Sequence, residues 1–246
     1  MSGGAGADVG TVTIPAPPGQ VVLAPARRQG RHRREGLALG NWSDRREVST
    51  EASTIRSNTM TTAGEHPTIE LSLAELREIA GYAVACAEPA MAIFDRARPS
   101  DRRSRAAVDA AQAFAAGAAR TKGIREAAWA AQRAFGAARD AGQAAAAEAA
   151  RAAVASAGAA FLHPLARATQ VWHLLGSAAH AARAFELAAC DDPAVGAAHL
   201  EQARVLARPV VVRVLLRYPN APGGRGRTGE LLRSLDAALR QQAAGA

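Results

Sequence analysis

Three of the six histidines, His163, His173 and His180, lie in one segment between Phe161 and Cys190. Histidine is a frequent metal ligand and acid–base group near neutral pH. If the segment is a continuous helix, His173 and His180 stand about 10 Å apart along its axis, and His163 about 15 Å from His173. A zinc ion needs ligand nitrogens at about 2 Å. The spacing disfavours a metal site made from these histidines alone, and we expect no metal or cofactor.

Other residues with catalytic potential are also isolated in the sequence. No G-x-S-x-G motif occurs, and neither Cys86 nor Cys190 lies in a redox or protease-type motif. Glu186 and Glu201 are single carboxylates without an evident acid–base partner. The run Gly223–Arg227 precedes a helical pattern and offers backbone N–H groups to a phosphate, but it follows no strand, so we interpret it as a plain loop. These observations favour a protein that is not an enzyme.

The histidines are positioned by a segment with clear helical periodicity. Pro164 suits the first turn of a helix, because the N–H that proline lacks has no partner there. Apolar residues then recur at three- and four-residue steps, which places them on one side of a helix: Val171, Leu174, Leu175, Ala178, Ala182 and Phe185. We predict that this helix, from Pro164 to about Cys190, is the central helix of the fold.

Helical patterns cover the rest of the chain from residue 71 onward. Ser72 and Glu75 form a capping box, and the apolar stripe that follows continues across Pro89. Between residues 106 and 160 there are 29 alanines in 55 residues, so helix propensity alone makes this region helical. The predicted helices cover about 72–97, 101–119, 121–139, 143–162, 164–190, 192–218 and 228–241, with Thr228 capping the last. We therefore predict an all-α fold, a single antiparallel bundle of about seven helices.

Residues 1–66 have a different composition, rich in proline, glycine and arginine. Such a segment buries too little apolar surface to offset its ordering entropy, so we predict that it is disordered and that residues 67–246 form the folded domain. A basic cluster at residues 27–34 lies in this segment. Met60 is followed by a sequence typical of a protein start, so we also consider it as the true initiation site.

The composition indicates how the core is packed, what net charge the chain carries and where in the cell the protein is expected. Aromatic residues make up 4 % of the chain, so the core must depend on alanine-rich helices that approach closely. Lys and Arg number 30 and Asp and Glu 22, a formal charge of +8. We expect Cys86 and Cys190 to be buried, reduced thiols. The sequence contains no long apolar run and no secretory signal, so we expect a cytoplasmic protein with no membrane contact.

One run resembles a known family. The residues HPLARATQVWHLLGSAAH from His163 to His180, with ELSLAELREIAGYAVACAEPAM near the start and LLRYPNAPGGRGRTGELLRSL near the end, resemble the alanine-rich putative immunity proteins of bacterial, especially actinobacterial, toxin–immunity systems. The resemblance covers about Leu71 to Arg240. It implies an all-α domain that binds and neutralises a cognate toxin without catalysing a reaction.

If the chain binds a toxin, we expect the partner-binding surface on or near the central helix. Its candidate residues are His163, Gln170, His173, His180 and Arg183, although burial in the core would equally explain the histidines. Without residues 1–66 the charge is 22 − 16 = +6, which favours a toxin with an acidic surface. Two alternatives remain. One is a basic protein that contacts nucleic acid through Arg102, Arg103, Arg105 and the cluster at residues 27–34, and the other is a metal-dependent enzyme using the three histidines. Nucleic acid is the less favoured partner, and the sequence leaves the oligomeric state open.

Overall fold

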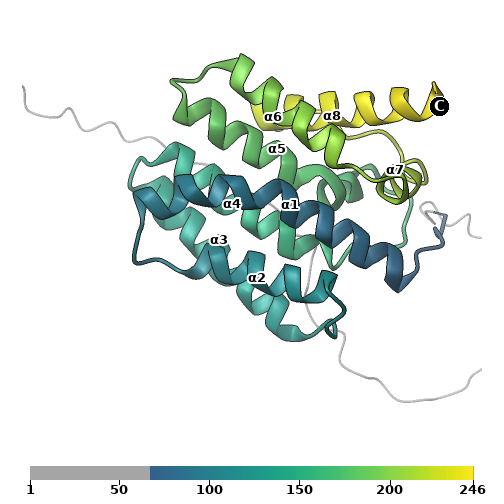
Figure 1. Cartoon of the computed structure of the whole chain (residues 1–246), viewed down its shortest axis with the longest axis horizontal. Coiled ribbons are helices and arrows are strands. Elements are labelled where there is room, and N and C mark those ends of the chain that lie inside the picture. Colours follow the sequence, from purple (N-terminus) through teal and green to yellow (C-terminus); the bar gives the residue numbers. More distant parts are fainter. Residues whose placement is uncertain (1–66, 246) are drawn as a thin grey trace, which may run out of the picture. The chain divides into compact units, whose positions relative to one another are not determined.

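The computed structural model of the chain describes residues 67–245, which form a bundle of helices (Figure 1). Its elements are α1 (Leu73–Ala97), α2 (Arg103–Ala115), α3 (Lys122–Asp140), α4 (Ala144–Ala159), the 3₁₀ turn η1 (Ala168–Gln170), α5 (Val171–Ala188), α6 (Pro193–Leu206), α7 (Pro209–Leu215) and α8 (Gly226–Ala244). The predicted all-α class is confirmed, with eight α-helices and no strand in the described range. The predictions for residues 1–66, including the arginine cluster and the start at Met60, lie outside it.

Helix α1 begins and continues as its sequence predicts. Ser72 and Glu75 form the capping box: the Ser72 N–H donates to Glu75 Oε2 at 2.9 Å, and the Glu75 N–H donates to Ser72 Oγ at 3.2 Å. The helix runs through Pro89 to Ala97, two residues before Pro99. Its length lets it pack against α2, α4 and α5 in turn.

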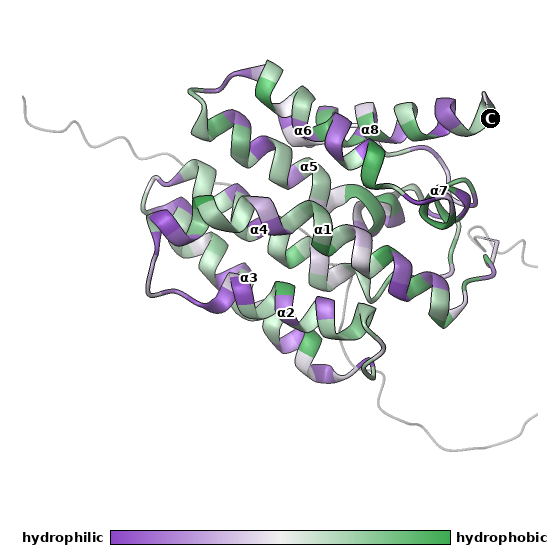
Figure 2. Ribbon diagram, in the orientation of Figure 1, coloured by the Kyte–Doolittle hydropathy of each residue, from purple (hydrophilic) through white to green (hydrophobic). Residues whose placement is uncertain are grey.

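Helices α4 and α5 occupy the middle of the bundle. Helix α4 packs against α1, α2, α3 and α5, whereas α5 packs against α1, α4, α6 and α8, which agrees with its predicted central position. Hydrophobic residues predominate along both helices (Figure 2). Small side chains let them approach closely: a Cβ placed on Gly176 of α5 would lie 3.7 Å from the Cβ of Ala155 of α4. No described helix combines the length and the apolar character that a membrane span requires.

The central helix starts later than predicted. Pro164 is not in a helix, and α5 begins at Val171 after the 3₁₀ turn. The segment around Pro164 instead runs beside the chain that enters α1. The Ile69 N–H donates to the Pro164 carbonyl at 2.9 Å, and the Ala166 N–H donates to the Pro67 carbonyl at 3.0 Å. These long-range hydrogen bonds provide partners for backbone N–H and C=O groups of the segment, so it does not need to be helical.

The predicted helix over residues 192–218 is two helices in the structure. Asp192 caps α6 as predicted, since it accepts from the Ala194 N–H at 2.9 Å. The prediction that the helix crosses Pro209 is wrong. Arg208 is extended, as the residue before a proline prefers, and Pro209 becomes the first residue of α7. The β-branched run Val210–Val214 is helical, as predicted.

Three other helix boundaries differ by a few residues. Helix α2 ends at Ala115, because Gly117 adopts a φ of +114° and closes the helix with a left-handed residue. Helix α4 ends at Ala159. Helix α8 begins after Arg225, which itself has a left-handed φ of +62°, so Thr228 lies inside the helix and does not cap it.

The two cysteines differ in exposure, which corrects the expectation of two buried thiols. Cys86 is buried in α1, whereas Cys190 is exposed after α5, at a φ of +57°. Burial raises the pKa of the Cys86 thiol to about 12, and a hydrogen bond with Tyr82 offsets only part of this effect. Because the thiolate is the reactive form, we expect maleimide to label one thiol per native chain and two in concentrated guanidinium chloride. Mass spectrometry of tryptic peptides would check this, and native labelling of Cys86 would contradict it.

The start of α1 contains an acid-sensitive ion pair. Glu75 accepts from Arg217 Nη2 at 2.6 Å. This hydrogen bond, with those from Ser72, lowers the pKa of Glu75 from 4.5 to about 2. A depressed folded-state pKa means that the ionised carboxylate stabilises the fold above about pH 4.5 and that this contribution is lost as the pH falls toward 2. We therefore expect the stability difference between the native chain and Glu75→Gln to narrow between about pH 7 and pH 3.

Urea unfolding across this pH range would measure the effect. Glutamine retains the capping geometry, so the substitution mainly removes the charge. Glu126→Gln is the matched control: it removes an exposed carboxylate 3.7 Å from Lys122 and should change stability little at any pH. If the difference in unfolding free energy between the native chain and Glu75→Gln stayed constant with pH, the lowered pKa of Glu75 would be contradicted.

Candidate functional site

The five predicted partner-binding residues fall into two groups in the structure. His163, Gln170 and His173 gather where α4 connects to α5. Gln170 is buried, and its Oε1 accepts from the His163 N–H at 2.9 Å. Nδ1 of His173 lies 3.0 Å from the Gly158 carbonyl and donates to it. Burial lowers the pKa of His173, an effect that this hydrogen bond opposes. Gln170 and His173 thus hold the connection, whereas His163 is exposed on it.

The second group, His180 and Arg183, lies further along α5. His180 is 9 % exposed, and its Nδ1 is 2.7 Å from Oε2 of Glu148 on α4. Burial would raise the pKa of Glu148, but the His180 hydrogen bond and the charges of His180, Arg151 and Arg183 lower it overall. Glu148 is therefore held as a carboxylate on the outward side of α4, beside basic groups.

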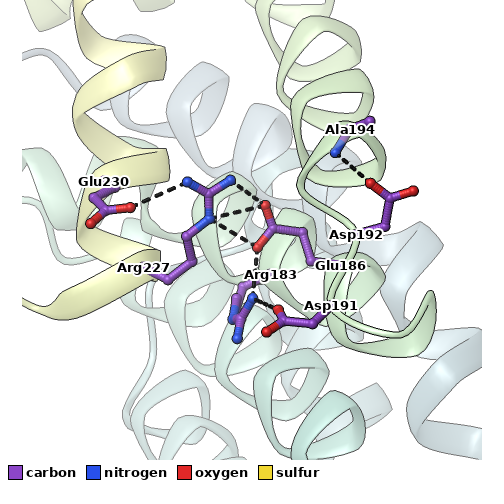
Figure 3. A network of polar contacts seen from close by, with 7 residues as sticks. All are labelled: Arg183, Glu186, Asp191, Asp192, Ala194, Arg227 and Glu230. Carbon is purple, nitrogen blue, oxygen red and sulfur yellow. Dashed lines mark hydrogen bonds and ion pairs between the residues drawn. The ribbon is translucent and has the colours of Figure 1, made fainter.

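Arg183 belongs to a network around a buried carboxylate (Figure 3). Glu186 is fully buried and receives Arg183 Nη1 at 2.8 Å and Arg227 Nη2 at 2.6 Å. Arg183 also bonds Asp191, and Arg227 lies 3.2 Å from Glu230. The two arginines point at Glu186 from different sides in Figure 3. The network joins α5 to α8, so Arg183 stabilises the bundle as well as reaching its surface.

A pair of arginines that the sequence analysis did not select lies close to this second group. Arg151 of α4 is 7 % exposed; its Nη1 donates to Gln132 Oε1 at 2.8 Å, and its guanidinium lies 4.9 Å from the centre of the Phe135 ring. Arg225, just before α8, places its guanidinium 4.5 Å from the centre of the Trp172 ring. We call Arg151, Trp172 and Arg225 the Arg151–Arg225 cluster.

The Arg151–Arg225 cluster is electrostatically unusual. Burial lowers the pKa of both guanidinium groups, and the charge of Arg225 lowers that of Arg151 further, against a raising effect of Glu148. Neither arginine forms an ion pair with a carboxylate among residues 67–245. The indole Nε1 of Trp172 is buried and has no hydrogen-bond partner in the same range. The cluster therefore has unused hydrogen-bond donors and excess positive charge.

The sequence does contain a signal for this cluster. Glu148 and Arg151 are the two charged residues in the alanine run of α4, and a spacing of three places them on the same side of a helix. In a helix enclosed by four others, that side is expected to be the most polar one. Arg225 lies in the glycine-rich run that we interpreted as a plain loop, and the structure does place it in a loop before α8.

Two of the three arginines proposed for nucleic-acid contact are paired with carboxylates, whereas Arg102 is exposed. Arg103 pairs with Asp101 at 2.6 Å, and Arg105 pairs with Glu88 at 2.5 Å and Asp95 at 2.7 Å. Arg102 and Arg103 line an open hollow of about 770 Å³ where α1 connects to α2. Within residues 67–245, no group of three His, Cys, Asp or Glu side chains is arranged to hold a metal ion.

The fold and its polar contacts define an all-helical, alanine-rich bundle whose polar side chains bond to one another between helices. Residues 70–208 match the family described as Imm-5 like putative immunity protein, so the chain belongs to that family, as the resemblance indicates. The match extends from the start of α1 to the end of α6, and Arg225 lies beyond it. No curated protein and no solved structure matches the chain.

Proposed function

We propose that this chain is an immunity protein that binds a cognate bacterial toxin in the cytoplasm and neutralises it without catalysing a reaction. The observation that carries the proposal is the family match over residues 70–208, which includes α1 to α6. The engagement of His173 and His180 with Gly158 and Glu148 disfavours the metal-dependent alternative, because their Nδ1 atoms already have partners within the bundle.

The toxin-binding surface that we propose follows the outward side of α5 and the connection before it. His163 is exposed on that connection and contacts the toxin directly. The Gln170 side chain fixes the connection by accepting from the His163 N–H, and the His173 side chain fixes the start of α5 by bonding the Gly158 carbonyl of α4. His180 and Arg183 add polar groups at the border of this surface. Glu148 holds His180 in place, and Glu186 holds Arg183.

The test uses the toxin domain encoded beside the gene for this chain. We expect the full chain to bind the purified domain stoichiometrically in calorimetry and to restore the growth of cells that express the toxin. His163→Ala should weaken binding by about tenfold, the loss typical of one contact in a protein interface. Lys122→Ala, at a side chain that is 87 % exposed, is the control and should leave binding unchanged. If the chain neither binds the domain nor protects the cells, the proposed function is wrong.

A further inference from the structure

We propose that the Arg151–Arg225 cluster is a binding site for a carboxylate, supplied by an aspartate or glutamate side chain of the toxin. This inference rests on the proposed function and specifies the chemistry of the partner. It assigns a ligand to a site made by α4, α5 and the loop before α8, which includes none of the five residues selected from the sequence.

Arg151 provides the recessed part of the site. Its Nη1 bonds Gln132, but its other two guanidinium nitrogens make no hydrogen bond to residues 67–245. They are not among the fully buried unpaired atoms, so they keep some contact with solvent. A buried guanidinium whose fork is only partly used is suited to a carboxylate, because the planar donors match both oxygens of the acid. Phe135 packs against the guanidinium and limits its rotation.

Arg225 and Trp172 provide the outer part. Arg225 is exposed, lies over the indole ring and makes no ion pair with residues 67–245, and its backbone is fixed in a left-handed conformation. Gly176 makes room for the indole, because a Cβ there would lie 3.3 Å from Trp172 Cε3. The positive charge of Arg225 acts on Arg151, and an anion bound near both guanidinium groups would relieve this repulsion.

The surroundings favour a single acidic side chain over a nucleic acid. A nucleic acid is bound through many exposed basic groups along its backbone. Here Arg151 is 7 % exposed, and Glu148 lies near enough to influence its pKa, so a polyanion would meet a carboxylate at the same place. Arg103 and Arg105, which the nucleic-acid alternative would require, already pair with carboxylates. One recessed and one exposed arginine fit one carboxylate.

The first experiment uses an acetylated and amidated peptide with a single glutamate flanked by glycines as the probe. It is titrated into the full chain carrying Trp42→Phe and Trp129→Phe, so that the fluorescence comes from Trp172. We expect a saturable change in emission, and Arg225→Gln should weaken peptide binding by about 10- to 100-fold, the range for a lost hydrogen bond to a charged group. Arg213→Gln, at an exposed arginine of α7, is the matched control and should not change it.

The outcomes separate the two proposals. Absence of saturable peptide binding, equal binding by Arg225→Gln, or tighter binding of a duplex DNA than of the peptide would each overturn the carboxylate site. The toxin domain is then tested with the same variants. If the native chain and Arg225→Gln bind toxin equally, the site is wrong while the immunity function stands. If the peptide binds at the cluster but the native chain does not bind toxin, the function is wrong while the anion site stands.

Discussion

Replacing Gly196 with alanine is expected to lower the free energy of unfolding by about 3–5 kcal/mol, the range for disrupting a buried charged group. A Cβ at position 196 of α6 would overlap Oε1 of Glu186 and lie 2.6 Å from its Cδ. Glu186 is fully buried, and Arg183 and Arg227 hold its carboxylate. The carboxylate cannot move away from the new methyl group without weakening these ion pairs. Urea unfolding followed by circular dichroism would measure the loss.

A control and a double variant make this prediction specific. Gly136 lies inside α3, and a Cβ there would have no neighbour within 4 Å, so Gly136→Ala should raise stability by about 0.5–1 kcal/mol. Glu186→Ala removes the group that the Gly196 methyl would overlap. The double variant should therefore lose less stability than the two single variants lose together. Native stability in Gly196→Ala, or strict additivity, would show that α6 does not pack on Glu186 in this way.

Local signals explain why most of the helices were predictable. The capping box of α1 involves residues three apart, and the alanines of α4 favour a helix whatever surrounds them. The errors occur where distant residues decide the structure. Pro164 lies outside the helix, and its carbonyl bonds Ile69, almost a hundred positions earlier. Nothing in the neighbouring sequence contains that information.

The candidate site was less predictable for the same reason. The sequence indicates Glu186 as a single carboxylate on a helix, but its partner Arg227 lies 41 residues later, on α8. The Arg151–Arg225 cluster joins residues even further apart. In an alanine-rich helix the apolar pattern is nearly uniform, so periodicity does not identify the side that faces solvent. In α4 the two charged residues, Glu148 and Arg151, indicate the polar side of the helix better than the apolar pattern does. A search for charged residues within alanine runs would have found this side.

Replacing Phe114 with alanine should cost about 3–5 kcal/mol, near the upper end for a core truncation. Phe114 is fully buried and is the one large aromatic side chain on α2, whose other buried residues are Ser104, Ala107, Val108 and Ala111. The cost of a cavity depends on how far the neighbouring groups can collapse into it. Around α2 many of them are alanines, which have no flexible side chain to extend. The backbones are already close, because a Cβ on Gly81 of α1 would lie 3.7 Å from the Ala115 Cβ.

The effect should be concentrated in α2, because this helix buries no other side chain larger than valine. Hydrogen exchange should show the amides of Arg103–Ala115 losing protection first, while those of α5 lose protection only with global unfolding. Phe114→Leu keeps most of the volume and should cost less than about 1.5 kcal/mol. Trp129→Ala removes an aromatic side chain from a residue that is 45 % exposed, and it should change stability by much less. If Phe114→Ala and Trp129→Ala proved equally mild, the alanine helices would have to adapt more readily than close packing of small side chains allows, and the thin-core account of this bundle would fail.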